Sequence, residues 1–265
     1  MYEAPERWTS IDSTRSIQVS ETQATRLRWY NALMGLLHAG QGVVILLLAN
    51  GFSLPVTSTF LNGPPGTDPE LRHLFDIRIA WGIAAFVFLS AAAHWILAGP
   101  AFRWYIENLR KQRNYARWIE YSVSASIMIV LIAMLTGIGE VVALIGLIGA
   151  NAAMILFGLV MEHYEQPGKP NWLAFIFGCI FGALPWIGIT IYVWSPGLSA
   201  NPPGFVYGIF VSLFIFFNCF ALNMWLQYKR IGPWRNYVFG ETVYILLSLT
   251  AKSALAWQVF FPTLV

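Results

Sequence analysis

The chain has 265 residues, of which 57% are hydrophobic and only 11% are charged, whereas about a quarter of residues are charged in soluble domains. This composition excludes an ordinary soluble domain and indicates a membrane protein. The net charge is only +3, and the basic residues lie at the ends of apolar segments, so nothing supports binding to nucleic acid. Cys179 and Cys219 both lie inside apolar runs, which indicates unreactive thiols and not a disulfide framework.

Apolar segments long enough to span about 30 Å of hydrocarbon recur along the chain. Clusters of Pro and Gly separate them, and no internal repeat is visible. The sequence therefore predicts an all-α membrane protein, a seven-transmembrane helix bundle that forms one domain at 29–262 after a polar N-terminal segment at 1–28. The predicted spans are 29–50, 76–98, 106–136, 139–162, 171–194, 204–228 and 237–262.

Lysine and arginine predict the orientation of this bundle, because they are enriched in cytoplasmic loops. Nearly all of the 16 basic residues fall in the N-terminal segment or after the second, fourth and sixth spans. Arg72 and Arg78 alone fall on the opposite side. We therefore expect a multi-pass protein of the cell membrane with a cytoplasmic N-terminus and an extracellular C-terminus.

The connection at 51–75 is long for a loop in a compact bundle. Within it, the stretch from Val56 to Phe60 has the composition of a β-strand. We expect an extracellular loop ordered as a short hairpin, and an irregular surface loop is the alternative.

One lysine lies deep inside the last span. Lys252 is about 16 residues into the span, or roughly 24 Å along a helix. A charge at such depth costs roughly 2.5–3.5 kcal/mol on insertion scales, so it marks a functional site by default. A lysine near a helix end can extend its amine to the interface without any further role, but the apolar residues on both sides of Lys252 argue against this.

A buried cation requires a buried anion, and the third span supplies Glu120. Glu120 shares a helix face with Ser124, four residues later. The alternative is an interfacial ion pair between Glu120 and Arg117. Glu120 lies nearer the start of its helix than Lys252 does, but a helical side chain tilts toward the N-terminus of its helix, so the lysine arm closes part of this gap.

Other polar residues are weaker candidates. His38 and Gln41 share one face of the first span, and Ser90 and His94 share one face of the second. Two structural histidines with satisfied hydrogen bonds are the alternative. Two acidic residues close to predicted cytoplasmic helix ends could line an inner cavity or simply be solvated: Glu162 and Glu241.

Three motifs resemble the heliorhodopsin family. They are Arg117-Trp-Ile-Glu-Tyr-Ser-Val-Ser-Ala-Ser126 in the third span, the stretch at 218–229 in the sixth, and Ser248-Leu-Thr-Ala-Lys252 in the seventh. The resemblance covers nearly the whole chain, and the inverted topology of this family agrees with the orientation predicted from charge.

The resemblance implies a retinal chromophore, all-trans in the dark, bound covalently to Lys252 as a Schiff base with Glu120 as its counterion. A polyene needs a narrow apolar slot, although core packing explains each of the candidate residues equally well. The implied site also contains Ser90, Tyr121, Ser124, Asn151, Met154, Phe217, Phe220, Met224 and Ser248. A proton-accepting polar cluster would consist of His38, Gln41 and His94.

Two positions argue against vectorial proton pumping. Ser248 stands where proton-pumping microbial rhodopsins carry a second carboxylate, one turn before the lysine, and Leu131 stands three turns beyond Glu120 at the place of a donor carboxylate. We therefore expect a light-sensing photoreceptor with a slow photocycle, not an enzyme, that signals to an unknown cytoplasmic partner. A light-gated proton channel or transporter of the same family is the alternative.

Two further expectations concern metals and assembly. A membrane zinc hydrolase would need clustered histidines, whereas the four histidines are scattered, so we expect no metal site. Small residues spaced four apart can support helix association in the bilayer, although this spacing often occurs by chance. The resembling family is dimeric through the region of two such patterns, which favours a homodimer through Gly149 and Ala153 or through Gly178 and Gly182.

Overall fold

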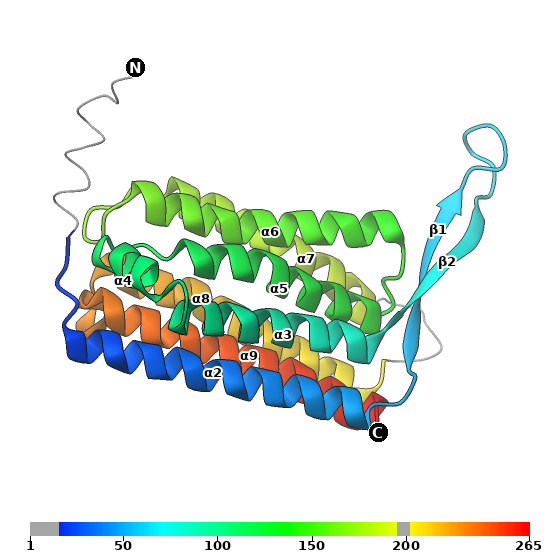
Figure 1. Ribbon diagram of the computed structural model, residues 1–265. Helices are drawn as coiled ribbons and strands as arrows, with labels where there is room; N and C mark the ends of the chain where they lie inside the picture. The colour runs from blue at the N-terminus through cyan, green and yellow to red at the C-terminus, as the bar shows by residue number, and fades with distance from the viewer. Residues whose placement is uncertain (1–15, 195–201) are drawn as a thin grey trace, which may run out of the picture.

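The computed structural model describes residues 16–194 and 202–265. Within them, seven helices are long and apolar enough to cross a membrane, and they form one bundle (Figure 1). This confirms the predicted seven-helix membrane protein. The helices are α2 (Glu21–Leu48), α3 (Ile79–Ala98), α5 (Tyr115–Leu135), α6 (Val141–Tyr164), α7 (Leu173–Val193), α8 (Gly204–Lys229) and α9 (Tyr237–Thr263).

Helix α2 begins eight residues before the predicted span. Ser20 caps it, because its hydroxyl accepts the Gln23 backbone N–H at 3.2 Å while the Gln23 side chain accepts the Ser20 N–H at 3.0 Å. This reciprocal capping box satisfies two N–H groups that a helix start would otherwise leave free. Residues 21–28 therefore belong to the first helix and not to a separate polar segment.

The prediction of one continuous helix over 106–136 is wrong. A separate amphipathic helix, α4 (Phe102–Arg110), lies at the end of the bundle where the N-terminal residues enter, and α5 starts only at Tyr115 (Figure 1). Gln112 has a left-handed backbone with φ of 55°, which ends the first helix. Asn114 then caps α5 by accepting the Arg117 N–H at 3.1 Å.

The predicted hairpin is confirmed and is longer than expected. Strands β1 (Ser53–Phe60) and β2 (Glu70–Arg78) pair antiparallel with a bulge after Val56. The Thr57 N–H donates to the Gly139 carbonyl at 2.8 Å, and the Ser58 hydroxyl donates to the Glu140 carboxylate at 3.0 Å. These contacts attach the hairpin to the start of α6.

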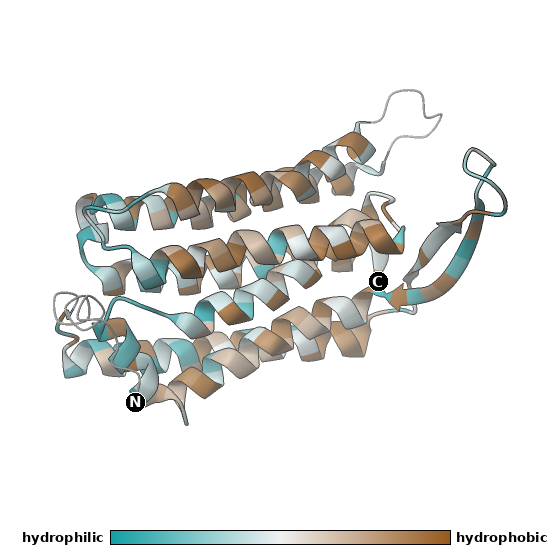
Figure 2. Ribbon diagram, turned by 90° about the horizontal axis from the view of Figure 1, so that it is seen from above, coloured by the Kyte–Doolittle hydropathy of each residue, from teal (hydrophilic) through white to brown (hydrophobic). Residues whose placement is uncertain are grey.

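The two ends of the bundle differ in composition and in what they carry. One end, here called the N-terminal end, carries α4 and the entry of the chain, whereas the hairpin and the C-terminus lie at the opposite hairpin end (Figure 1). Apolar residues cover most of each helix, and polar residues gather at the ends and on the hairpin (Figure 2). Fully buried apolar side chains of α3, α5 and α9 form the main core, among them Phe86, Leu131 and Leu255.

The two small-residue patterns face different surroundings. A side chain at Gly182 would meet the Met154 sulfur at 2.5 Å, and one at Gly178 would meet the Met154 carbonyl at 3.3 Å. This pattern therefore packs α7 against α6 inside the protomer. A side chain at Gly149 would meet nothing within 4 Å, so the α6 pattern is the one left open to lipid or to a second copy.

Candidate functional site

The structure brings Lys252 and Glu120 together although they lie on different helices. The Lys252 amine donates to Glu120 Oε1 at 2.8 Å, and the two side chains are only 4% and 9% exposed. The amine also donates to the Ser248 hydroxyl at 3.1 Å. Ser248 lies one turn closer to the start of α9, so the lysine arm tilts in the direction that helix geometry requires.

The carboxylate of this pair is held from a third helix. The Ser90 hydroxyl of α3 donates to Glu120 Oε1 at 2.6 Å. Ser124 is fully buried one turn after Glu120 on α5. The Tyr121 ring lies under the Lys252 amine, whose nitrogen is 5.0 Å from the ring centroid. An amine and a carboxylate removed from water are costly alone and stable together only with such additional polar partners.

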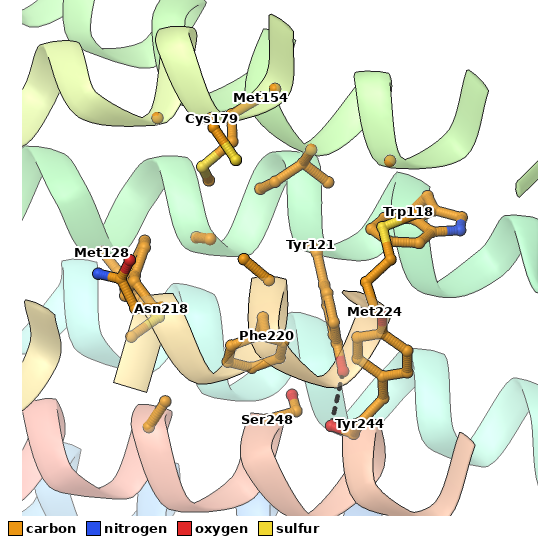
Figure 3. A pocket seen from close by; sticks show the side chains of 18 of the residues that line it. Trp118, Tyr121, Met128, Met154, Cys179, Asn218, Phe220, Met224, Tyr244 and Ser248 are labelled. Atoms are coloured by element: carbon orange, nitrogen blue, oxygen red, sulfur yellow. Dashed lines mark hydrogen bonds between the residues drawn. The ribbon is translucent and has the colours of Figure 1, made fainter. Parts of the chain in front are cut away.

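Lys252 of this ion pair lines an apolar cavity of about 290 Å³. Figure 3 shows many of the side chains that line it. Residues of α5, α6, α7, α8 and α9 line it. The predicted members that line the cavity are Tyr121, Ser124, Met154, Phe217, Phe220, Met224, Ser248 and Lys252. Asn151 does not line it, because its amide donates instead to the Ser126 hydroxyl at 3.1 Å.

Sequence reasoning missed several residues that line the same cavity. Tyr244 lies two turns before Lys252, and Met128 lies two turns after Glu120, so extending the helical period from the ion pair would have found both. Trp118, Trp186 and Asn218 also line the cavity. The Tyr121 hydroxyl donates to the Tyr244 carbonyl at 2.9 Å, which joins α5 to α9 beside the cavity (Figure 3).

The histidines of α2 and α3 form a pair, but Gln41 does not join them. The rings of His38 and His94 stack with centroids 5.7 Å apart, and His94 Nδ1 lies 2.7 Å from Asn31 Oδ1. Gln41 instead accepts a hydrogen bond from Trp257 Nε1 at 3.1 Å. The predicted trio is therefore corrected to His38, His94 and Asn31.

His38 has unsatisfied hydrogen-bonding capacity. It is fully buried, and neither of its ring nitrogens has a hydrogen-bond partner among the described residues. Buried polar atoms are rarely left without a partner, so such atoms indicate ordered water. A neighbouring cavity of about 30 Å³ lies between His94, Glu120 and Glu241, among other residues, and has room for a water molecule.

A second buried charge cluster lies toward the N-terminal end of the bundle. Arg117 forms ion pairs with Glu162 and Glu241, and all three side chains are 3% exposed or less. The alternative pairing of Arg117 with Glu120 is therefore wrong, and neither Glu162 nor Glu241 is a solvated helix end. The cluster is completed by hydrogen bonds from Tyr105, Asn114, Trp118 and Tyr237.

The two charge clusters are connected through two tyrosines, Tyr244 and Tyr121. The Arg117 guanidinium lies 3.9 Å from the centroid of the Tyr244 ring. The Tyr244 carbonyl accepts the Tyr121 hydroxyl, and the Tyr121 ring lies under the Lys252 amine. Direct contacts therefore run from the lysine to the buried arginine.

A comparison with protein families decides the identity of this arrangement. The family model described as Heliorhodopsin matches residues 27–264, which is most of the chain. The chain belongs to the heliorhodopsin family. No curated protein matches it significantly.

Solved microbial rhodopsins share the fold of this heliorhodopsin family member. Cyanorhodopsin from the cyanobacterium Tolypothrix sp. has a TM-score of 0.60 at 16% identity over 93% of this chain and 96% of its own. The light-driven proton pump of Coccomyxa subellipsoidea has a TM-score of 0.61 at 16% identity over 92% of this chain and 98% of its own. The transmembrane domain of the Salpingoeca rosetta rhodopsin phosphodiesterase has a TM-score of 0.61 at 11% identity over 95% of this chain and 92% of its own.

Membership of the heliorhodopsin family implies a retinal chromophore, and the described residues fit one. The cavity is almost entirely apolar in its lining, as a polyene requires, and its volume is near the lower end of small-molecule pockets, about 300–1,000 Å³. Lys252 supplies an amine in the lining of this cavity. Glu120 supplies the buried anion that such a site needs to keep a positive charge on the lysine nitrogen.

Proposed function

We propose that this chain is a light-sensing photoreceptor in which all-trans retinal is bound covalently to Lys252 and Glu120 is the counterion. The observation that carries this proposal is the Lys252–Glu120 ion pair, 2.8 Å long, whose lysine lines an apolar cavity. When bound as a Schiff base, retinal would supply the absorption of visible light and the isomerisation of one of its own double bonds.

The side chains around the pair have separable roles in this proposal. Glu120 stabilises a positive charge on the Lys252 nitrogen, because a buried unpaired charge would be strongly unfavourable. Ser90 fixes the carboxylate by donating a hydrogen bond at 2.6 Å. His38 and His94 stack on each other beside the pair, and their imidazole nitrogens are the proton acceptors in this proposal.

The distribution of buried polar groups supports signalling over pumping. Besides the Lys252–Glu120 pair, the buried charged residues in the described part of the chain are Arg117, Glu162 and Glu241, all toward the N-terminal end. Toward the hairpin end, α5 continues as a run of buried apolar residues from Met128 to Met134, including Leu131. Among the described residues, a proton leaving the lysine thus finds further buried charged groups toward the N-terminal end only, which disfavours vectorial transport.

A light-gated proton channel or transporter is the second candidate. The small cavity between Glu120 and Glu241 favours it, since water there would extend a polar path toward the N-terminal end. The apolar segment from Met128 to Met134 opposes it, because a conducting path would have to open through that layer during the photocycle.

Orientation and assembly belong to the same proposal. The excess of Lys and Arg at the N-terminal end supports a cytoplasmic N-terminus and an extracellular hairpin. The open space at Gly149 supports a homodimer through α6 in the bilayer. We propose a cytoplasmic signalling partner and no enzymatic activity of this chain.

The decisive experiment is an absorption spectrum of the purified protein expressed with all-trans retinal. We expect a visible band that bleaches with hydroxylamine and light. Lys252→Ala should have no such band, because no amine remains in the lining of the cavity, whereas Lys229→Ala, at the exposed end of α8, should keep it. A visible band in Lys252→Ala would contradict the proposal.

Illumination of cells that express the protein separates signalling from transport. We expect no light-driven change of external pH, with or without a protonophore. A steady acidification would show pumping, and a change that follows the applied proton gradient would show the channel.

A further inference from the structure

A second pocket, separate from the chromophore site, opens at the N-terminal end of the bundle. Its volume is about 190 Å³, and all four chain segments at that end contribute to it. Ile17 precedes α2, Gln112 lies between α4 and α5, and Gln166 and Pro167 lie between α6 and α7. The α8–α9 connection supplies Arg230, Trp234 and Arg235, and two buried residues complete the pocket, Gln227 and Tyr237.

The backbone is strained at two points of this pocket. Gln112 and Arg230 have φ of 55° and 54°, and they are the only non-glycine residues with positive φ in the described ranges. Each follows the end of a helix, where glycine usually takes the left-handed position because it has no side chain to strain. Both side chains line the pocket. Strained residues of this kind cluster at functional sites.

Both arginines of the pocket lack a carboxylate partner among the described residues. Arg235 Nε donates to the Arg230 carbonyl at 3.2 Å. The Arg230 side chain passes over Gly168, where an added Cβ would be 3.2 Å from Arg230 Cδ. In the described part of the chain, neither guanidinium has an acidic group within ion-pair distance. The lining of the pocket therefore carries two positive charges that no described carboxylate neutralises.

We propose that this pocket binds a small anion that carries a phosphate group. Two guanidinium groups in the lining of one pocket match the charge and the several oxygens of a phosphate, to which arginine donates paired hydrogen bonds. The pocket is smaller than drug-sized sites of about 300–1,000 Å³, so the ligand is a small molecule or a single headgroup. Soluble phosphates and phospholipid headgroups share this chemistry, and the enclosure of the pocket by four chain segments favours the soluble source.

The test is a titration of the full chain in nanodiscs of zwitterionic lipid with inorganic pyrophosphate, followed by calorimetry at constant ionic strength. We expect saturable binding of one anion per chain. Because the pocket is remote from Lys252, this binding does not depend on retinal, and its failure would leave the proposed photoreceptor function intact.

Variants make the assignment specific. Arg230→Gly and Arg235→Gln should each weaken binding roughly tenfold or more, as expected for the loss of a charge-assisted hydrogen bond. Arg230→Gly also relieves the left-handed backbone, so a loss of binding there does not reflect unfolding. Arg103→Gln removes an exposed arginine of α4 that lies outside the pocket and should leave the affinity unchanged.

A second arm identifies the source of the phosphate. Nanodiscs that contain phosphatidylinositol phosphate are compared by ³¹P NMR with and without the Arg235→Gln substitution. Binding of the headgroup alone would support the site with lipid as its ligand. Absence of binding in both arms, or an equal loss in Arg103→Gln, would overturn the proposal.

Discussion

Arg117 and Glu120 are three residues apart on α5 and yet neutralise different partners. The Arg117 side chain turns to Glu162 of α6 and Glu241 of α9, whereas Glu120 turns to Lys252 of α9. A buried guanidinium carries five N–H donors, and two carboxylates satisfy more of them than one. This division leaves Glu120 with the lysine as its sole ion-pair partner among the described residues.

Glu120→Gln tests this division directly. Without the carboxylate, the positive charge on the Lys252 nitrogen loses its ion-pair partner. Breaking one half of a buried pair costs about 3–5 kcal/mol, so the visible band should shift to longer wavelength or bleach at a pH roughly two to four units lower. Spectra recorded against pH measure both effects.

The control for Glu120→Gln is Glu140→Gln, a substitution at the hairpin end far from Lys252, which should leave the band unchanged. An unaltered colour and titration in Glu120→Gln would mean that another group balances the lysine charge.

At the scale of elements, one carboxylate attaches the hairpin to α6. The pKa of Glu140 lies below that of an ordinary glutamate, first because the Ala143 backbone N–H donates to it and then because the Ser58 hydroxyl does. A lowered folded-state pKa means that the stabilisation is complete above the unfolded value, about 4.3, and is lost as the pH falls through the lower value.

Hydrogen exchange at the Thr57 amide, which donates to the Gly139 carbonyl, reports this attachment. We expect its protection factor, corrected for intrinsic exchange, to fall below about pH 4. Glu140→Gln should lower it at neutral pH as well, whereas Glu70→Gln, in the exposed part of the hairpin, should not. Protection that does not change with pH would show that the carboxylate is not needed.

Helix α6 contains a matched pair of glycines that tests close packing. A side chain at Gly158 would lie 2.5 Å from the Trp118 ring, which is buried and donates to Glu162. We expect Gly158→Ala to cost about 1–3 kcal/mol through overpacking. Gly146→Ala has open space and should be neutral or stabilising by up to about 1 kcal/mol. Thermal unfolding of both variants in micelles makes the comparison, and equal midpoints would contradict it.

At the scale of the whole molecule, the proposed orientation has a direct consequence. In a background without Cys179 and Cys219, Thr67→Cys places a thiol near the exposed tip of the hairpin, and Arg103→Cys places one on α4. A membrane-impermeant maleimide added to intact cells should label the first and not the second. Lysis should make both reactive. The reverse pattern would place the N-terminus outside.

Much of the architecture could be predicted from the sequence because the membrane restricts it severely. An apolar run must form a helix of about 20 residues to satisfy its own backbone in hydrocarbon. Lys252 stands out because it is a lysine inside such a run. Its need for a buried anion then indicated Glu120. The break between α4 and α5 escaped prediction, because it depends on a left-handed backbone at Gln112, a residue type that does not signal one.

The sequence by itself thus determined the number of spans, the intramembrane lysine and its carboxylate candidate, because these follow from hydropathy and the cost of buried charge. Only the tertiary structure decided which side chains meet across helices. The rotation and tilt of each helix decide that Asn31, and not Gln41, lies beside the histidines. They also decide that Glu162 and Glu241 both pair with Arg117. Helical periodicity orders residues within one helix and leaves these relative positions open, since packing against neighbouring helices sets them.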